Sequence, residues 1–279
     1  MAQAYDAIIA TITVAGDASS VTKTMTKSTE WREGTSGAWS SANCTLTAGK
    51  VYQFRTPLSG MDSSKTGILP NIKADVVVDW DTTATKISTV GDYFMAYYAY
   101  NCSNLTTLGT PDTSGLTSVG THFMAYYAYN CSNLTTLGTP DTSGLSTVGD
   151  YFMAYYAGFC SNLTTLGTPD TSGLTGSVGT FLMAYYATSC NVLTALILPS
   201  ATGYFAGNNI NWGVPSGRNG YLYGYAPNAT AQTAWQALTV SGKTLYTNYI
   251  QSAAYVLIQG ALRRINLSGG MKELSGGML

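Results

Sequence analysis

The sequence predicts a mixed α/β repeat protein, built as a short solenoid between a small β-rich domain and a terminal cap. Three observations lead to this fold class. A 29-residue unit is copied three times almost verbatim and once imperfectly. Each copy has helix-like spacing of apolar residues in its first half and β-prone and turn residues in its second half. Hydrophobic residues make up 45% of the 279-residue chain, which is enough to bury a core.

The repeat occupies residues 90–199. Residues 94–116 and 123–145 are identical, and a copy of that length does not arise by chance. The four units begin at Val90, Val119, Val148 and Val178, with one extra residue near Gly176.

Within one unit, Phe94, Met95, Tyr98, Cys102 and Leu105 fall at helical spacing. The pattern predicts a short helix that ends near Cys102.

After that helix, residues 105–108 and 116–119 are β-prone and predict two short strands. Pro111, Asp112 and Gly115 lie between them and supply the residues of a turn. We therefore expect each coil to have a sheet side and a helical side.

One unit cannot bury its apolar face alone, so the units are expected to stack about 4.8 Å apart. Stacking predicts two buried columns of side chains. The leucine ladder is Leu105, Leu134, Leu163 and Leu193, and the cysteine ladder is Cys102, Cys131, Cys160 and Cys190. With Cys44 these are all the cysteines, and we expect them to be reduced core residues, because ladder side chains point the same way.

The repeat resembles a known family through its Val-Gly-Asp-Tyr-Phe start, its Cys-Ser-Asn-Leu core and its Asp-Thr-Ser turn. These strings are similar to the BspA-like leucine-rich repeats of bacterial and protist surface proteins. The resemblance covers roughly residues 75–199 and departs from the family pattern at Met95–Tyr98, which are extra helix residues. It implies a leucine-rich-repeat-like solenoid and a role in adhesion, and the family has no shared catalytic residues.

The flanks divide into four further segments. Residues 1–72 predict a small β-rich domain, with strands at 7–14, 44–46 and 50–55. Residues 73–89 look like an N-terminal cap half-repeat, and 200–252 like a C-terminal cap. Residues 253–279 predict a hairpin followed by a Gly-rich tail.

Charge and hydropathy argue against nucleic acid and membrane insertion, respectively. Only 10% of residues are charged, the net charge is −1, and no Lys or Arg lies between Lys86 and Arg218. Binding of nucleic acid needs clustered cations, so we expect no nucleic-acid partner. No run of about 18 apolar residues occurs, so we expect no membrane insertion.

The beginning of the chain has no basic segment before an apolar run, so no signal peptide is visible. The hydroxyl- and amide-rich composition favours an extracellular or virion-surface location.

The residues give no catalytic site and no cofactor. Asp112, Asp141 and Asp170 recur at one turn position, where capping of the turn explains them; a calcium site on this column is the alternative. His122 is the only histidine and aligns with Tyr93, Tyr151 and Phe181, which indicates an aromatic packing position.

The tyrosines are the remaining functional signal. Of 21 tyrosines, 12 lie in the four units. A helix cannot bury two successive residues equally, so one member of each Tyr-Tyr pair should face outward. The candidate binding face is Tyr97, Tyr100, Tyr126, Tyr129 and Tyr155. Rows of exposed tyrosines suit contact with a protein or a glycan surface; packing of the rings on neighbouring units or neighbouring chains is the alternative.

These observations predict a non-catalytic adhesion or display protein. The favoured hypothesis is a phage-type virion surface, fibre or receptor-binding component, which could self-associate into a fibre or particle. A secreted bacterial surface adhesin is the alternative. A polysaccharide-acting enzyme is a third hypothesis, against which the missing pair of catalytic carboxylates counts.

Overall fold

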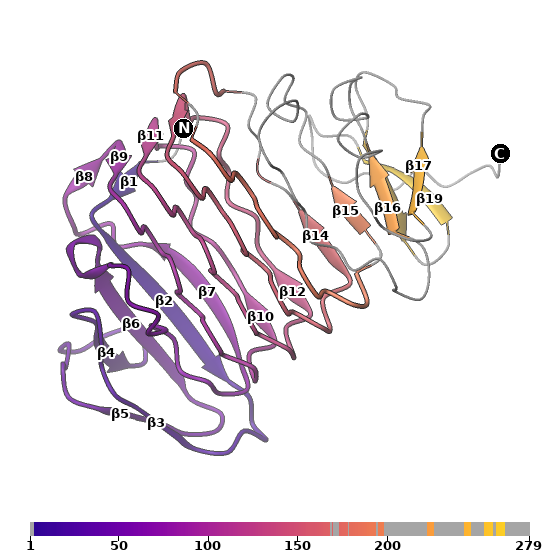
Figure 1. Ribbon diagram of the computed structural model, residues 1–279. Helices are drawn as coiled ribbons and strands as arrows, with labels where there is room; N and C mark the ends of the chain where they lie inside the picture. Colours follow the sequence, from indigo (N-terminus) through magenta and orange to yellow (C-terminus); the bar gives the residue numbers. More distant parts are fainter. Residues whose placement is uncertain are drawn as a thin grey trace.

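The structure is a computed structural model of the chain. It describes residues 3–167, 169, 173–177 and 179–193, and the strands at 195–197, 222–225, 243–246, 254–258 and 261–265 (Figure 1). The elements in chain order are β1 (Ala4–Tyr5), β2 (Ala7–Val14), β3 (Val21–Lys23), β4 (Glu30–Glu33), β5 (Cys44–Leu46), β6 (Val51–Pro57), the 3-10 turn η1 (Leu58–Gly60), β7 (Ala74–Trp80), β8 (Lys86–Ile87), β9 (Thr89–Val90), β10 (Thr107–Leu108), β11 (Ser118–Val119), β12 (Thr136–Leu137), β13 (Thr147–Val148), β14 (Thr165–Gly167), β15 (Ala195–Ile197), β16 (Leu222–Tyr225), β17 (Lys243–Tyr246), β18 (Ala254–Ile258) and β19 (Ala261–Ile265).

The N-terminal part is an antiparallel sheet with β2 between β6 and β7, and β4 beyond β6. Strand β2 alternates, so that Ile8, Ala10 and Ile12 are buried on one face. The strands expected at 7–14 and 44–46 match β2 and β5, and the one expected at 50–55 lies within one residue of the start of β6.

Strand β7 joins this sheet to the solenoid. It pairs antiparallel with β2 on one edge and parallel with β10 on the other. The sheet therefore runs without a break in the order β12-β10-β7-β2-β6-β4. Hydrogen bonds cross the boundary that we expected after residue 72, so the N-terminal sheet and the solenoid share one framework.

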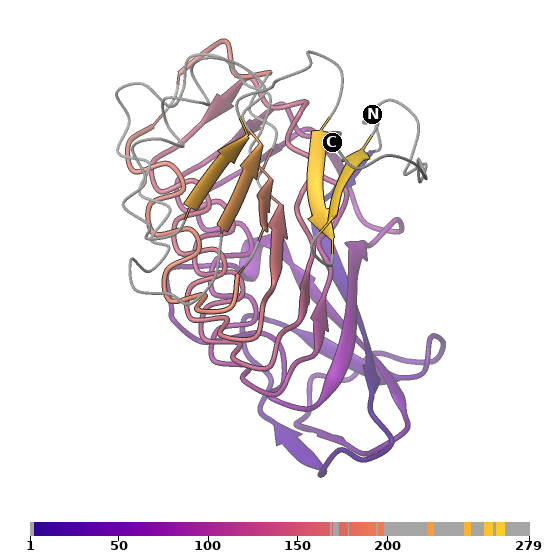
Figure 2. The ribbon, with the colours of Figure 1, turned by 90° about the vertical axis from the view of Figure 1, so that its right-hand side faces the viewer.

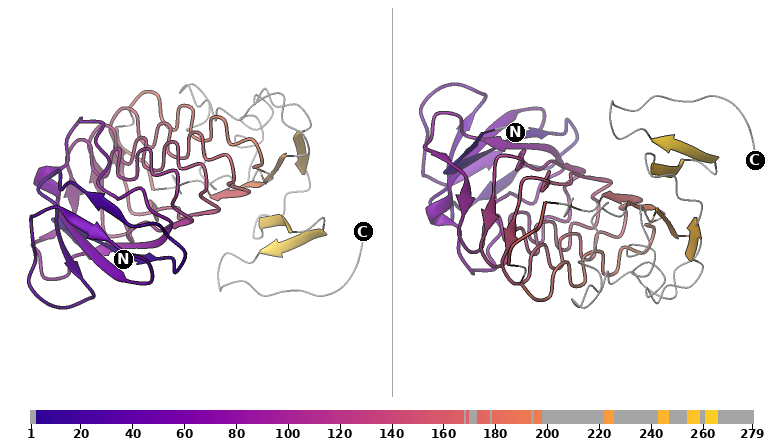
Figure 3. Two further views of the ribbon diagram at one scale, coloured as in Figure 1. Left: turned by 90° about the horizontal axis from the view of Figure 1, so that it is seen from below. Right: turned by 90° about the horizontal axis from the view of Figure 1, so that it is seen from above.

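The repeats coil as a solenoid, with two of their sides made of short parallel strands. Strands β10 and β12 pair one repeat apart, Thr107 with Thr136. Strands β9, β11 and β13 form the second parallel column. Figures 2 and 3 show the successive coils lying over one another beyond the N-terminal sheet.

The third side of each coil is not helical, and our prediction of a helix over residues 94–102 is wrong. The described residues contain no α-helix, so the mixed α/β class becomes a predominantly β repeat fold. In the first coil, positive φ angles occur at Tyr93 (61°), Met95 (50°), Tyr97 (60°) and Asn101 (62°). The same positions are positive in the next three coils: His122, Met124, Tyr126, Asn130; Tyr151, Met153, Tyr155, Phe159; Phe181, Met183, Tyr185, Ser189.

Hydrogen bonds between coils explain this backbone. A helix would satisfy its N–H groups internally, whereas here the amides of Tyr97 and Ala99 donate to the carbonyls of Ala125 and Tyr127 in the next coil, at 3.0 and 2.8 Å. The same ladder continues from the amide of Tyr126 to the carbonyl of Ala154 at 2.9 Å. The left-handed residues point these groups along the stack, and we call this side the turn side.

The first coil is covered by residues 67–72, which lie before the cap that we expected at 73–89. The amides of Ile68 and Leu69 donate to the carbonyl of Tyr98 at 2.9 and 3.1 Å. The side chain of Asn71 accepts from the amide of Asn104 at 2.8 Å. The cap is therefore a nearly complete coil, with residues 67–72 on the turn side and β7 and β9 on the strand sides.

Toward the C-terminus, β14, β15, β16 and β17 form a parallel sheet, so parallel pairing continues into the expected C-terminal cap at 200–252. Strands β18 and β19 pair antiparallel, as expected for the hairpin. The other residues of the segment 200–252 and the Gly-rich tail lie outside the described residues.

We expect Leu134→Ala to lower the free energy of unfolding by about 2–5 kcal/mol, because it removes a buried side chain between two neighbours of the ladder. The Leu134 side chain is 0% exposed. Denaturant melts measure the loss, and Asn133→Ala, at an exposed neighbouring position, is the control. A loss of only a few tenths of a kcal/mol for Leu134→Ala would contradict the stacking.

The turn side predicts an unusual substitution pattern at Asn130, where φ is 60°. Glycine adopts this conformation freely, while a β-branched residue is strained there. Asn130→Gly should change stability by less than about 0.5 kcal/mol, and Asn130→Val should lower it by about 1–2 kcal/mol. Equal stability of the two variants in thermal or denaturant melts would show that Asn130 is not left-handed.

Candidate recognition face

Three rows of aromatic side chains lie on the outside of the turn side, and we call them together the aromatic face. Equivalent residues of successive coils lie side by side in the stack, which places equivalent rings one coil apart. The rows are, first, Tyr93, His122, Tyr151 and Phe181; second, Tyr97, Tyr126, Tyr155 and Tyr185; third, Tyr100 and Tyr129, against which Phe159 of the third coil packs edge-on from the next position of its unit.

The rings of the second row stack on one another. Tyr97 and Tyr126 have centroids 4.9 Å apart, Tyr126 and Tyr155 4.7 Å, and Tyr155 and Tyr185 4.9 Å. Because each ring covers the face of its neighbour, the row presents ring edges and hydroxyl groups to the outside. Burial raises the pKa of Tyr126 to about 12, so its hydroxyl stays protonated and can both donate and accept.

Exposure of the face increases along the stack. Tyr97 is only 6% exposed, whereas Tyr185 is 43% exposed. All five tyrosines of the predicted binding face (Tyr97, Tyr100, Tyr126, Tyr129, Tyr155) belong to the second and third rows. The accessible part of the face is centred further along the chain than the sequence indicated.

The other member of each tyrosine pair is buried. Tyr98, Tyr127, Tyr156 and Tyr186 stack inside the solenoid and are 0% exposed. The hydroxyl of Tyr127 donates to the carbonyl of Gly109 at 2.5 Å, and that of Tyr156 to Gly138 at 2.6 Å. The hydroxyls of Tyr127, Tyr156 and Tyr186 therefore bind backbone carbonyls of the fold, and the outer rows remain as the candidate site.

The leucine ladder lies in the core, with Leu105, Leu134, Leu163 and Leu193 at 0% exposure. The cysteines of the second ladder (Cys102, Cys131, Cys160, Cys190) are buried free thiols. Their thiols also have a role that the sequence did not indicate: Cys131 donates to the carbonyl of Ala99 and Cys160 to that of Ala128, both at 3.1 Å. Burial raises the pKa of both thiols well above its usual value, so they remain donors.

The recurrent aspartates cap turns. Asp112 accepts from the amide of Ser114 at 2.9 Å, and Asp141 from that of Ser143 at 3.0 Å. Asp170 lies outside the described residues. Within the part of the chain that the structure describes, no group of three or more His, Cys, Asp or Glu residues has the arrangement of a metal site.

Two aspartates that the sequence analysis did not single out border the first row. Asp92 accepts from the amide of Thr121 at 2.7 Å, and Asp150 from the amide of Thr180 at 2.6 Å. The hydrogen bonds from Thr180 hold the pKa of Asp150 below its usual value, so this carboxylate stays ionised. In the sequence, the third residue of the unit alternates between Asp in the first and third units and Thr in the second and fourth, and this alternation could have indicated the pairing.

On the side of the coils that contains β10 and β12, threonine hydroxyls donate hydrogen bonds to backbone carbonyls. Thr106 donates to the carbonyl of Ala74 at 2.9 Å, and Thr135 to the carbonyl of Thr106 at 3.1 Å. This column therefore offers a partner fewer free groups than the aromatic face does.

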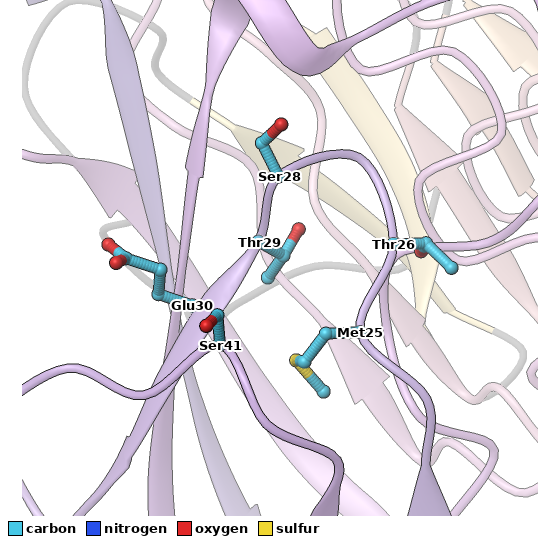
Figure 4. Close-up of a pocket in the computed structure, with 6 residues that line it drawn as sticks. All are labelled: Met25, Thr26, Ser28, Thr29, Glu30 and Ser41. Carbon is cyan, nitrogen blue, oxygen red and sulfur yellow. The ribbon is translucent and has the colours of Figure 1, made fainter.

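The N-terminal sheet carries a cavity of 310 Å³ lined by Met25, Thr26, Ser28, Thr29, Glu30 and Ser41 (Figure 4). A second hollow, of 240 Å³, contains Arg55, whose guanidinium pairs with Glu30 at 2.5 Å. No ring of the aromatic face lines either cavity, and the charged groups of the second are paired with each other.

No protein-family model, no curated protein and no solved structure matches the chain. In the described residues, no helix has the length and apolar character needed to span a bilayer.

His122 predicts a pH dependence of stability. Its ring lies between those of Tyr93 and Tyr151, with centroids 4.7 Å away on each side, and its Nδ1 is buried without a hydrogen-bond partner in the described structure. Burial lowers the pKa of His122 below 6.5, although the carboxylates of Asp92 and Asp150 oppose this shift. The unfolded chain then binds the proton more readily, so the stabilisation is present above the unfolded pKa and is lost as pH falls through the folded pKa.

We expect the Tm of the native chain to fall more than that of His122→Tyr when pH is lowered from about 7.5 to about 5. The Tyr variant restores the ring that the first and third units have at this position, and it retains every other titrating group. Equal losses in both proteins would show that His122 is as easily protonated in the fold as in the unfolded chain.

Proposed function

We propose that the chain is a non-catalytic adhesion or display protein of a virion surface, such as a fibre or receptor-binding component. In this role the solenoid is a rigid spacer, and the aromatic face contacts a protein or glycan surface. The observation that carries the proposal is the aromatic face itself: rows of aromatic rings, most of them tyrosines, that stack from coil to coil on a continuous framework.

Rigidity supports this role. The sheet that begins at β4 continues through β7 into β10 and β12, so the N-terminal sheet holds the first coils at a fixed orientation. A surface placed on such a framework loses little conformational freedom when it binds. Near-identical coils also present near-identical contacts, and several weak contacts reinforce one another through effective concentration.

The finer fold assignment is a leucine-rich-repeat-like solenoid. The spacing of the Cys and Leu positions that resembles BspA-like repeats puts both side chains into the core of every coil, for instance Cys131 and Leu134. This arrangement supports the likeness and, with it, the second candidate function, that of a bacterial surface adhesin. The turn side without a helix is where the unit departs from our expectation.

The test replaces three rings of the second row. Tyr126→Asn, Tyr155→Asn and Tyr185→Asn together remove the stacked rings, and asparagine tolerates the positive φ of these positions better than most residues. The matched control, Thr136→Ala, Thr165→Ala and Thr175→Ala, changes three exposed hydroxyl residues elsewhere on the coils. Fluorescently labelled proteins are applied to a panel of bacterial cells and to a glycan array.

We expect the asparagine variant to lose at least about tenfold in binding, since contacts are lost on three coils at once, and the threonine variant to bind like the native chain. A second variant with phenylalanine at the same three positions keeps the stacks and removes only the hydroxyls. It should bind more weakly than the native chain even if the asparagine variant does not fold. A folded asparagine variant with native binding would place recognition outside the second row, and native binding by the phenylalanine variant would show that the tyrosine hydroxyls do not contribute.

A further inference from the structure

The geometry of the rows decides what kind of contact the aromatic face offers. A pyranose ring binds tyrosine by lying on the face of the aromatic ring. In the second row each internal ring has another ring on both faces; for Tyr126 these are Tyr97 at 4.9 Å and Tyr155 at 4.7 Å. Edges and hydroxyl groups remain, and they suit hydrogen bonding and edge contacts with a polypeptide.

The third and fourth coils depart from the earlier copies toward apolar residues on this face. Asn101 and Asn130 are exposed in the first two coils, and Phe159 takes their place in the third with 42% exposure. Phe181 stands where the first and third coils have tyrosine and is 40% exposed. Both exposed apolar rings lie where the tyrosines of this face are also most exposed, and they mark the third and fourth coils as the centre of the contact.

Charge on the face has one sign. Residues 87–217 contain no Lys or Arg. Asp92 and Asp150 each use Oδ1 to accept backbone hydrogen bonds, and in the described structure neither Oδ2 has a hydrogen-bond partner. The two carboxylates occupy equivalent positions two coils apart, a separation of about 10 Å along the stack.

We propose that the partner of the aromatic face is a cationic, extended polypeptide segment that lies along the stack, with Lys or Arg side chains reaching Asp92 and Asp150. This inference rests on the proposed function and specifies its partner. A polypeptide with a cation at every third residue in the polyproline II conformation repeats that charge at about 9 Å, close to the spacing of the two carboxylates.

The aromatic face offers both apolar and polar contacts to the side chains of such a segment. The aliphatic part of Lys or Arg packs on Phe159, Phe181 and the edges of the tyrosines, while the charged end reaches a carboxylate or a tyrosine hydroxyl oxygen. A polyanion has no cation to meet on these coils, and a neutral glycan would leave the carboxylates desolvated without compensation.

The test uses three probes on the full chain: the peptide (Arg-Pro-Ser)₄, the peptide (Glu-Pro-Ser)₄ and maltoheptaose, measured by calorimetry at about 100 mM salt. The double variant Asp92→Asn/Asp150→Asn removes two charges and keeps the Oδ1 acceptors. The matched control is Asp112→Asn/Asp141→Asn, which removes the same charge from capped turns at another corner of the coils.

We expect the Arg peptide alone to bind, the first double variant to weaken it at least about fivefold, and the control to weaken it less than about twofold. Equal effects of the two double variants would show attraction by net charge only and overturn the proposal. Binding of maltoheptaose without the Arg peptide would assign the face to glycans, and absence of binding by all three probes would also overturn it. In either case the proposed function still stands if the triple asparagine variant loses cell binding.

Discussion

The structure depends on hydrogen bonds between successive coils of the turn side. Four residues in each coil adopt the left-handed region without being glycine, at a cost of about 1–2 kcal/mol each, and only a neighbouring coil can offset it. Each neighbour accepts a row of amide donors and covers a row of rings. A single coil has neither compensation, so the repeats are stable only as a stack. This requirement also keeps the equivalent rings in register, because a coil that slipped by one residue would exchange the outward and inward tyrosines.

The first coil has no repeat before it to supply hydrogen-bond partners, and the N-terminal region supplies them instead. Residues 67–72 give the carbonyl of Tyr98 its donors, and β7 gives β10 its parallel partner. Strand β7 can do this because its other edge is held by β2, so the stack begins from an already ordered antiparallel sheet. One group is not matched: the Tyr98 hydroxyl is buried without a hydrogen-bond partner in the described structure, whereas the equivalent hydroxyl of Tyr127 donates to the carbonyl of Gly109.

The side chains available for function are those with polar groups that make no hydrogen bonds within the stack. Three of the four inner tyrosines, the thiols of the cysteine ladder and several threonine hydroxyls donate to backbone carbonyls, so the packing of the core explains why these residues recur. The outer rings contribute to the fold only by stacking. Their exposure rises toward the third and fourth coils, from 6% at Tyr97 to 43% at Tyr185. Stacking also restricts what they can bind, because it hides the ring faces and leaves edges, hydroxyls and the bordering carboxylates of Asp92 and Asp150. The regularity that stabilises the solenoid thus also defines the chemistry of its surface.

By itself the sequence determined the repeat, its 29-residue period, the composition of the leucine and cysteine ladders and the short strands at each corner, because each follows from a local pattern of apolar and turn residues. It also indicated that one tyrosine of each pair faces outward. It did not determine the conformation of residues 94–102, where apolar residues at helical spacing fit a helix and the observed coil equally well. Only the tertiary structure decided between them, because the coil becomes favourable when a neighbouring coil supplies acceptors for its amides, carbonyls for its thiols and rings for its tyrosines. None of those partners is close in the sequence, and no local propensity can represent them.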